Sequence, residues 1–230
     1  MEFFMALGSI IVMDLALAGD NAVVIAMAAN KLSHDERKKA ILIGTGGAVG
    51  IRIALTFIAV ELLTIPFLQA LGGLILLPIA IGLLAPAHKE GDGKHIEAAH
   101  TLGAAVKTII IADAAMSLDN VLSIAGAAQG HFLLVAAGLV ISIPIVVAGS
   151  SLLGAIMDRF PALMYVGAAI IGWTSGKMFL ADKALGASIT DVFATFGSAG
   201  HYILPAVLAV AVCVIGHFKA AHQAKASTAI

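Results

Sequence analysis

Acidic residues stand inside two long apolar segments of this sequence. Asp14 and Asp20 interrupt the first segment, and Asp113 and Asp119 interrupt a later one. A carboxylate in hydrocarbon is unfavourable, because desolvation penalises the charged form and neighbouring like charges repel one another. A bound cation relieves both problems, and oxygen ligands favour Mn²⁺, Mg²⁺ or Ca²⁺ over Cu²⁺ or Zn²⁺. The four aspartates therefore predict a divalent cation site inside a membrane.

Two basic residues could face the same site. Arg52 and Lys177 lie within or at the edge of apolar segments, where a charge is costly unless it is paired or hydrated. Together with the four aspartates they sum to a charge of -2, which one divalent ion would neutralise. Arg52 and Lys177 could instead act as gates that fill the empty site, form static ion pairs with the aspartates, or extend toward the helix ends. The aspartates could instead join helices by hydrogen bonds. We expect Arg52 to face the cavity, and the sequence favours neither position for Lys177.

The two acidic segments are similar to each other. Residues 14–29 and 113–128 match at eight of sixteen positions with an offset of 99 residues, and the matches include both aspartates and the following asparagine. Fainter similarity relates residues 51–53 to 143–145. Each unit then holds three helices, so the second unit enters the membrane from the opposite side. The pattern predicts two inverted repeats related by a pseudo-two-fold axis in the membrane plane.

The spacing of the aspartates predicts interruptions in both acidic helices. Asp14 and Asp20 are six residues apart and would lie about 120° apart around an unbroken helix, too far to face one ion. Gly19 permits an unwound turn before Asp20 and Asn21, and residues 117–120 offer similar chemistry. Freed backbone carbonyls at such a turn can join carboxylates as ligands. We therefore predict a local break in each helix.

The composition identifies the elements that must position these residues. Hydrophobic residues make up 60% of the 230-residue chain and charged residues only 12%, whereas soluble domains have about a quarter of their residues charged. The fold class predicted is all-α, a polytopic membrane protein with seven transmembrane helices, arranged as two inverted three-helix repeats and one C-terminal helix. The predicted spans are residues 3–29, 40–62, 66–86, 103–128, 132–156, 161–181 and 202–218.

The loop charges predict the orientation and the domain boundaries. Nine lysines and arginines fall in loops on one side of these spans and only Lys183 falls on the other, so the N-terminus is expected outside and the C-terminus in the cytoplasm. The divisions expected are a first repeat at 1–86, a cytoplasmic loop at 87–102, a second repeat at 103–181, and a final part at 182–230. That final part holds an extracytoplasmic loop, the seventh helix and a cytoplasmic tail.

Three further features have structural explanations as well as functional ones. Met116 could add a soft sulfur ligand that favours Mn²⁺ over Mg²⁺, although helical methionines are usually packing residues. The loop at 88–100 carries histidines and mixed charges and could sense cytoplasmic metal, although such runs are usually only solvated. The single cysteine, Cys213, excludes an intramolecular disulfide and a thiolate cluster, and we expect it to pack inside the last helix.

The motifs around both aspartate pairs resemble the signatures of the TerC family of integral membrane proteins. The similarity extends to residues 51–53, 138–144 and 172–177, and it is closest to the short YjbE-type branch, whose relatives are linked to manganese efflux. The resemblance implies manganese as the transported substrate. It also implies metal contacts at six residues: Asp14, Asp20, Asn21, Asp113, Asp119 and Asn120.

The function predicted is a manganese exporter in the bacterial cytoplasmic (inner) membrane that works by alternating access, with protons as a plausible counter-ion. No organic cofactor and no enzymatic activity are expected. The net charge of -1 gives no indication of nucleic-acid binding. A homo-oligomer is compatible with the sequence. Direct transport of tellurite is not expected, because an oxyanion prefers helix N-termini and basic side chains. Two alternatives are an interaction protein that supports metal loading or secretion of exported proteins, and an intramembrane metal-dependent enzyme.

Overall fold

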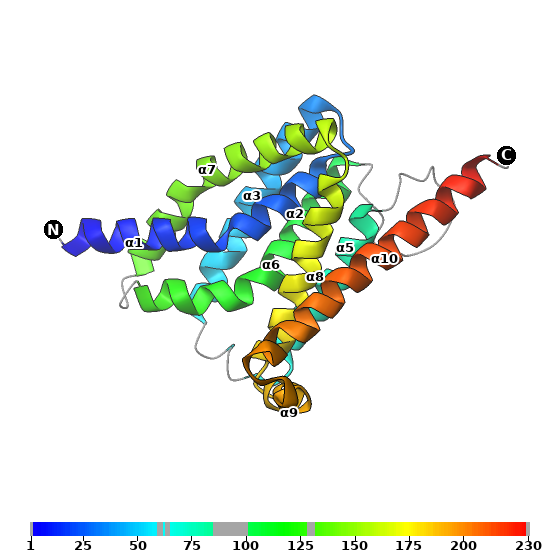
Figure 1. The fold of residues 1–230 in the computed structure, drawn as a ribbon. Coiled ribbons are helices and arrows are strands. Elements are labelled where there is room, and N and C mark those ends of the chain that lie inside the picture. Colours follow the sequence, from blue (N-terminus) through cyan, green and yellow to red (C-terminus); the bar gives the residue numbers. More distant parts are fainter. Residues whose placement is uncertain (1, 59–61, 63–64, 85–100, 128–131, 229–230) are drawn as a thin grey trace.

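The computed structural model describes residues 2–58, 62, 65–84, 101–127 and 132–228, in which helices joined by turns are the only regular secondary structure (Figure 1). This confirms the all-α fold class. Within the described residues each of the seven predicted apolar ranges overlaps a helix, and the first range is divided between two helices. The elements in chain order are α1 (Glu2–Leu17), α2 (Gly19–Ala29), α3 (His34–Phe57), α5 (Leu68–Leu84), α6 (Leu102–Ala127), α7 (Phe132–Arg159), α8 (Leu163–Ala181), α9 (Gly186–Val192), the 3₁₀ helix η1 (Ala194–Ala199) and α10 (Gly200–Thr228).

Several of these helices are long and apolar enough to cross a bilayer. Among the described residues four helices meet that test, at His34–Phe57, Leu133–Arg159, Leu163–Ala181 and Ala194–His222. The bent pair α1–α2 makes a fifth when it is counted as one broken span, and α5 is a shorter apolar helix. The chain is therefore an integral membrane protein. The predicted loop at 88–100 lies almost wholly outside the described residues.

The first acidic segment breaks where Gly19 predicted it. Helices α1 and α2 meet at Ala18 with a bend of 53°. The Ala18 amide still donates to the Asp14 carbonyl and the Ala22 amide to the Ala18 carbonyl, but the carbonyls of Leu15, Ala16 and Leu17 accept no backbone hydrogen bond across the break. Freed carbonyls at this depth require polar surroundings, because hydrocarbon cannot satisfy them.

The second predicted break is wrong in this structure. Helix α6 runs without interruption from Leu102 to Ala127 and includes residues 117–120. The physical reason is local: the Ser117 hydroxyl donates to the Asp113 carboxylate one turn earlier, so this polar pair is satisfied on the face of a regular helix. The two acidic segments are thus similar in sequence but different in backbone conformation.

Helices from the two halves of the sequence pack against each other. Helix α3 packs along α6, the α1–α2 segment packs along α7, and α5 packs along α8, with α10 covering α8 from outside (Figure 1). Small residues allow these approaches, as is common between membrane helices. A Cβ added at Gly44 of α3 would lie 2.9 Å from Ile109 of α6, and one at Gly73 of α5 would lie 2.9 Å from the Ser175 carbonyl oxygen of α8. The contact at Gly44 sets the depth and rotation of α3, from which Arg52 projects.

A buried aspartate at the end of α8 holds the start of α5. The Asp182 carboxylate accepts hydrogen bonds from the amides of Phe67 (3.3 Å), Ala70 (3.1 Å), Ala184 (2.9 Å) and Leu185 (3.2 Å). Burial raises the pKa of this carboxyl, but the four amide donors outweigh burial and hold the pKa below its ordinary value. Asp182 therefore caps α5 and closes the turn after α8 at the same time.

Replacing Asp182 by alanine should lower the free energy of unfolding by about 2 kcal/mol, because four buried or partly buried amides lose their acceptor. A carboxyl with a lowered folded-state pKa contributes stability above its unfolded pKa of about 3.9, and the contribution is lost as the pH falls through the folded-state pKa. The difference in melting temperature between the wild type and Asp182→Ala in detergent should therefore shrink below about pH 4. The exposed Asp191→Ala is the control, and an equal or growing difference at low pH would contradict this role.

Candidate functional site

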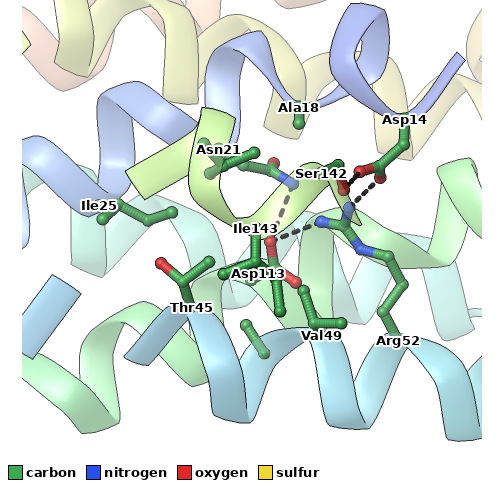
Figure 2. Close-up of a pocket in the computed structure, with 12 residues that line it drawn as sticks. Asp14, Ala18, Asn21, Ile25, Thr45, Val49, Arg52, Asp113, Ser142 and Ile143 are labelled. Atoms are coloured by element: carbon green, nitrogen blue, oxygen red, sulfur yellow. Dashed lines mark hydrogen bonds and ion pairs between the residues drawn. The ribbon is translucent and has the colours of Figure 1, made fainter. Parts of the chain in front are cut away.

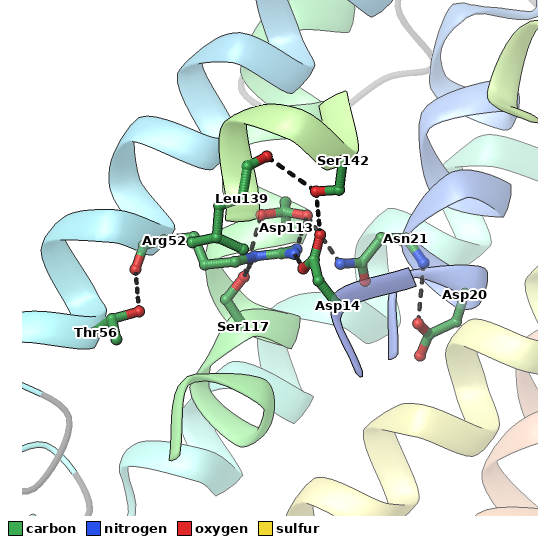
Figure 3. Close-up of polar contacts among 9 residues, drawn as sticks. All are labelled: Asp14, Asp20, Asn21, Arg52, Thr56, Asp113, Ser117, Leu139 and Ser142. Carbon is green, nitrogen blue, oxygen red and sulfur yellow. Dashed lines mark hydrogen bonds and ion pairs between the residues drawn. The ribbon is translucent and has the colours of Figure 1, made fainter. Parts of the chain in front are cut away.

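A guanidinium joins the two aspartates that begin the repeated motifs (Figure 3). Arg52 of α3 lies between Asp14 of α1 and Asp113 of α6, with Nη1 2.5 Å from the Asp14 Oδ1 and Nη2 2.6 Å from the Asp113 Oδ1. The three residues are 3%, 1% and 5% exposed, respectively. Two carboxylates and one guanidinium leave a net charge of -1 in a nearly closed interior. This buried triad is the charged cluster of the site.

Neutral side chains complete the shell around the triad. The Ser117 hydroxyl accepts from the Arg52 Nε at 2.9 Å and donates to the Asp113 Oδ2 at 3.1 Å. The Ser142 hydroxyl of α7 donates to the Asp14 Oδ2, and the side-chain Nδ2 of Asn21 on α2 donates to the Asp113 Oδ1 at 2.9 Å. Each carboxylate is therefore held by Arg52 and by at least one neutral donor. Bonds of this kind orient the carboxylates in a low-dielectric interior.

Two buried oxygens beside the triad have no partner in the described structure. They are the Asn21 Oδ1 and the Thr45 Oγ1, both of which lie on residues lining a small cavity next to Asp113 (Figure 2). The cavity has a volume of about 10 Å³, near the lower limit for a single water-sized body. An unsatisfied buried polar atom costs about 1–3 kcal/mol, so these oxygens indicate a small guest that supplies positive charge or a donor.

A second, larger cavity is also lined by residues next to the helix break. Its volume is about 270 Å³. It is lined by Ala16, Leu17, Asp20, Met116, Asn120, Thr174 and Lys177. The Thr174 hydroxyl donates to the Asp20 Oδ2 at 3.2 Å, and the backbone N–H of Asn21 donates to the Asp20 Oδ1 at 3.0 Å. Figure 3 shows Asp20 on the far side of Asn21 from the Arg52 cluster.

The structure divides the six predicted metal contacts between two places. Asp14, Asn21 and Asp113 meet around Arg52, whereas Asp20 and Asn120 line the larger cavity. The side chain of Asp119 lies outside the described residues. Among the described side chains no group of three or more His, Cys, Asp or Glu residues is close enough together to hold a metal ion. The six residues do not converge on one point in this conformation, and their role as ligands stays a prediction.

The two basic residues also separate. Arg52 is in the buried triad, as expected from its position within a span. Lys177 lines the larger cavity with Asp20 and is exposed. Arg52 therefore lies beside Asp14 and Asp113, whereas Lys177 lies in the same cavity as Asp20.

Four hydroxyl residues of the site were missed by the sequence analysis: Thr45, Ser117, Ser142 and Thr174. Helical spacing could have found two of them, because Ser117 is one turn after Asp113 and Thr45 is two turns before Arg52 on the same face. Ser142 and Thr174 come from α7 and α8, and no spacing within one helix predicts their contacts. Only the packing of distant helices brings these two residues to the aspartates.

The arrangement is suited to holding and exchanging positive charge. Two convergent carboxylates with amide and hydroxyl oxygens nearby are hard ligands, and Arg52 already occupies the position between the carboxylates. Fold and site together define a helical integral membrane protein that keeps a charged cluster in its interior. The chain belongs to the TerC family: the family model described as "Integral membrane protein TerC family" matches residues 1–224. The resemblance found in the sequence is thereby confirmed.

Bacterial membrane proteins are similar to this chain. The uncharacterized membrane protein YjbE of Bacillus subtilis (strain 168) is 45% identical over 184 residues, which are 80% of this chain and 83% of that protein. The uncharacterized membrane protein YkoY of the same organism is 27% identical, covering 78% of this chain and 61% of YkoY. The UPF0053 inner membrane protein YgdQ of Escherichia coli (strain K12) is 26% identical, covering 70% of this chain and 73% of YgdQ. No solved structure gives a significant match.

Proposed function

We propose that this protein carries a divalent cation, Mn²⁺ as the main substrate, out of the bacterial cell by alternating access around the Asp14–Asp113 pair. The observation that supports this best is the position of Arg52. Its guanidinium neutralises part of the charge of two buried carboxylates and fills the space between them. When Arg52 withdraws, two carboxylates and one divalent ion sum to zero charge. Arg52 is then a substitute for the cation in the empty site, and the cation must displace it.

The neutral groups support a desolvated cation at this site. The Asn21 Oδ1 and the Thr45 Oγ1 line the small cavity without partners among the described residues, and oxygen donors suit Mn²⁺, Mg²⁺ and Ca²⁺. The volume of about 10 Å³ excludes a hydrated ion in this conformation. Binding therefore requires loss of hydration water together with movement of Arg52. A closed site that opens only with the cation is what alternating access needs.

The helix packing supports the inverted-repeat arrangement. If α1–α2, α3 and α5 are equivalent to α6, α7 and α8, then the packing of α3 along α6 has its counterpart in the packing of α7 along α1–α2. Exchanging the two units maps the contact of α5 with α8 onto itself, and it does the same for the contact of α3 with α7. A pseudo-two-fold axis requires this pattern, and rocking of one three-helix unit against the other would open the site to alternate sides.

The orientation proposed places the N-terminus outside and the C-terminus in the cytoplasm. One contact supports the grouping of positive loops on one side: Arg37 at the start of α3 donates to the Asn30 carbonyl and forms an ion pair of 2.5 Å with Asp158 at the end of α7. The turn before α3 and the end of α7 therefore lie at the same end of the bundle. Both carry basic residues that belong on the cytoplasmic side of a membrane.

Flux into liposomes tests the proposed function directly. Purified protein in liposomes should move Mn²⁺ faster than protein-free liposomes, with slower movement of Mg²⁺, Ca²⁺ and Zn²⁺ measured separately under the same gradient. An imposed proton gradient should change the Mn²⁺ rate, because carboxylates can exchange a metal for protons. Equal rates with and without protein for all four ions would refute cation transport. Faster movement of another ion would replace Mn²⁺ as the substrate.

A further inference from the structure

We infer that residues 183–199, the anchor segment, lie in the headgroup region of the bilayer and hold the bundle to one leaflet. The anchor segment connects α8 to α10 and contains α9 and the 3₁₀ helix η1. In the proposed orientation this leaflet is the outer one. From the sequence, the region is expected to be only an extracytoplasmic loop. The inference concerns a contact with lipid, so it goes beyond cation transport and does not depend on it.

The anchor segment runs across the direction of the two helices that it connects. Both α8 and α10 belong to helices that are long and apolar enough to cross a bilayer. Figure 1 shows α9 nearly along its axis, at the end of the bundle where α8 and α10 meet, whereas those two helices are seen from the side. A helix that lies at the end of two spans and across their direction is roughly parallel to the membrane plane. Interfacial amphipathic helices have this position.

The composition of the anchor segment favours contact with lipid over exposure to water. Between residues 184 and 199 the only charged side chain is Asp191. The expected cytoplasmic loop at 87–102 has five charged side chains in a stretch of the same length. A solvated loop carries charges of this kind, whereas a segment at the boundary of headgroups and acyl chains needs few.

One side of the anchor segment packs on the bundle and another side is exposed. Leu185, Ile189 and Phe193 follow one another at intervals of four residues and are partly buried. Val192 and Phe196, in contrast, are 72% and 62% exposed. Large apolar side chains are unfavourable in water, and burial among lipid acyl chains removes this cost. The exposed side therefore fits the boundary between headgroups and acyl chains.

This exposed side continues the lipid-facing surface of α10. Val207 and Val210 of α10 are 54% and 62% exposed, within a span that must contact acyl chains. At the start of α10, Tyr202 is 61% exposed and stacks on Trp173 of α8, with ring centroids 6.2 Å apart. Tryptophan and tyrosine are enriched at membrane–water interfaces because their rings are amphipathic. The aromatic pair thus marks the level of the headgroups beside η1, and the bilayer is the partner that covers both surfaces.

Asp182 connects the anchor segment to the bundle. Its carboxylate accepts from two amides at the start of the anchor segment and from the amides of Phe67 and Ala70 at the start of α5. At the other end, Gly197 has a φ of 59°, a conformation that favours glycine, and the chain turns there from η1 into α10. Contact between the anchor segment and one leaflet therefore fixes the depth of α5, α8 and α10 together.

Depth-dependent fluorescence quenching tests the location of the anchor segment. Cys213→Ser removes the single cysteine of the chain, and Phe196→Cys, Val210→Cys or Lys38→Cys then adds one reporter position. Each full-length variant is labelled with the fluorophore NBD and reconstituted in liposomes of phosphatidylcholine and phosphatidylglycerol. The quenchers are iodide on both sides of the membrane, a lipid with a spin label near the headgroup, and a lipid with a spin label deep in the acyl chain. Lys38 is exposed in the charged run at the start of α3 and reports water, whereas Val210 reports the hydrocarbon.

The label at residue 196 should be quenched most by the shallow spin-labelled lipid. Iodide should quench it at least about threefold less than it quenches the label at residue 38, because the headgroup region excludes part of the solvent. The label at residue 210 should be quenched most by the deep spin-labelled lipid. Val192→Cys is a second reporter in the anchor segment and should behave like Phe196→Cys. It keeps the test decisive if the replacement of Phe196 prevents folding.

Three results would overturn the anchor. Iodide quenching at residue 196 equal to that at residue 38, without an effect of either spin-labelled lipid, would place the segment in water. Strongest quenching by the deep spin label would place it in the hydrocarbon. Shielding from all three quenchers, together with energy transfer between labelled copies, would show that a second copy of the chain covers this surface. Each result leaves cation flux in liposomes unaffected, so the anchor and the proposed function can fail separately.

Discussion

Replacement of Arg52 by glutamine is expected to lower the free energy of unfolding by about 3–5 kcal/mol, because it leaves two buried carboxylates without their cation. For a chain of this size each kcal/mol corresponds to about 2–4 °C in melting temperature, so the variant should melt on the order of 10 °C below the wild type in detergent. Ser117 would also lose the group that donates to its hydroxyl. The effect is large because Asp14 and Asp113 are only 1% and 5% exposed, so little water can replace the guanidinium.

Manganese should reverse much of this loss. If Arg52 occupies the position of the cation, then Mn²⁺ binds the variant without having to displace a side chain, and it should raise the melting temperature of Arg52→Gln more than that of the wild type. Ligand at 100 times its dissociation constant stabilises a protein by about 2.7 kcal/mol. An equal Mn²⁺ effect on both proteins would show that Arg52 does not compete with the cation.

Two further variants keep this test interpretable. Arg52→Lys preserves the positive charge with fewer donors, so it should fold and melt between the wild type and Arg52→Gln. Arg37→Gln removes a partly exposed ion pair with Asp158 and should cost no more than about 1 kcal/mol, without any difference in Mn²⁺ response. A similar loss in Arg37→Gln and Arg52→Gln would mean that burial of the triad is not the cause.

Replacement of Asp113 by asparagine is expected to reduce Mn²⁺ flux in liposomes by about 100-fold or more while the protein remains folded. Loss of even an outer ligand partner typically costs 10–100-fold in metal affinity or activity, and here a charged ligand is lost. Without the Asp113 charge, the remaining Asp14 is fully balanced by Arg52, so no charge remains to attract a divalent ion. Asp14→Asn should have an effect of the same size, because Asp14 is the equivalent position in the first repeat.

The control for the flux experiment is Asp158→Asn. Asp158 is an exposed aspartate at the end of α7, and its replacement removes one negative charge outside the buried triad. It should retain flux within about twofold, as expected for an exposed ion pair of small energy. Wild-type flux in Asp113→Asn, with Asp158→Asn unchanged, would remove the Asp14–Asp113 pair from the transport path.

The two acidic segments have different conformations in this structure. The first is bent at Ala18 and places Asn21 against Asp113, whereas the second is continuous and places Asn120 beside the larger cavity. Similarity in sequence therefore does not give the two segments the same backbone conformation.

Much of the helical arrangement could be predicted from the sequence, since each of the seven apolar ranges overlaps a helix within the described residues. The bilayer explains this success: a backbone in hydrocarbon must satisfy its own hydrogen bonds, so a long apolar run leaves few alternatives to a helix. The break at Ala18 followed Gly19, which precedes Asp20 and Asn21. The matching break in α6 was predicted wrongly, because the same motif is compatible with a continuous helix when Ser117 satisfies Asp113 one turn away.

The sequence by itself determined that a small set of carboxylates, amides and cations must lie inside an apolar helical protein, because their types and positions within the spans are local properties of the chain. Only the tertiary structure decided which of them meet. Arg52 reaches both Asp14 and Asp113, and Asp20 is turned into a different cavity, because close packing at Gly44 and the bend at Ala18 set the rotation of each helix. The rotation of each helix depends on contacts between distant segments, so it cannot be derived from the spacing of residues along that helix.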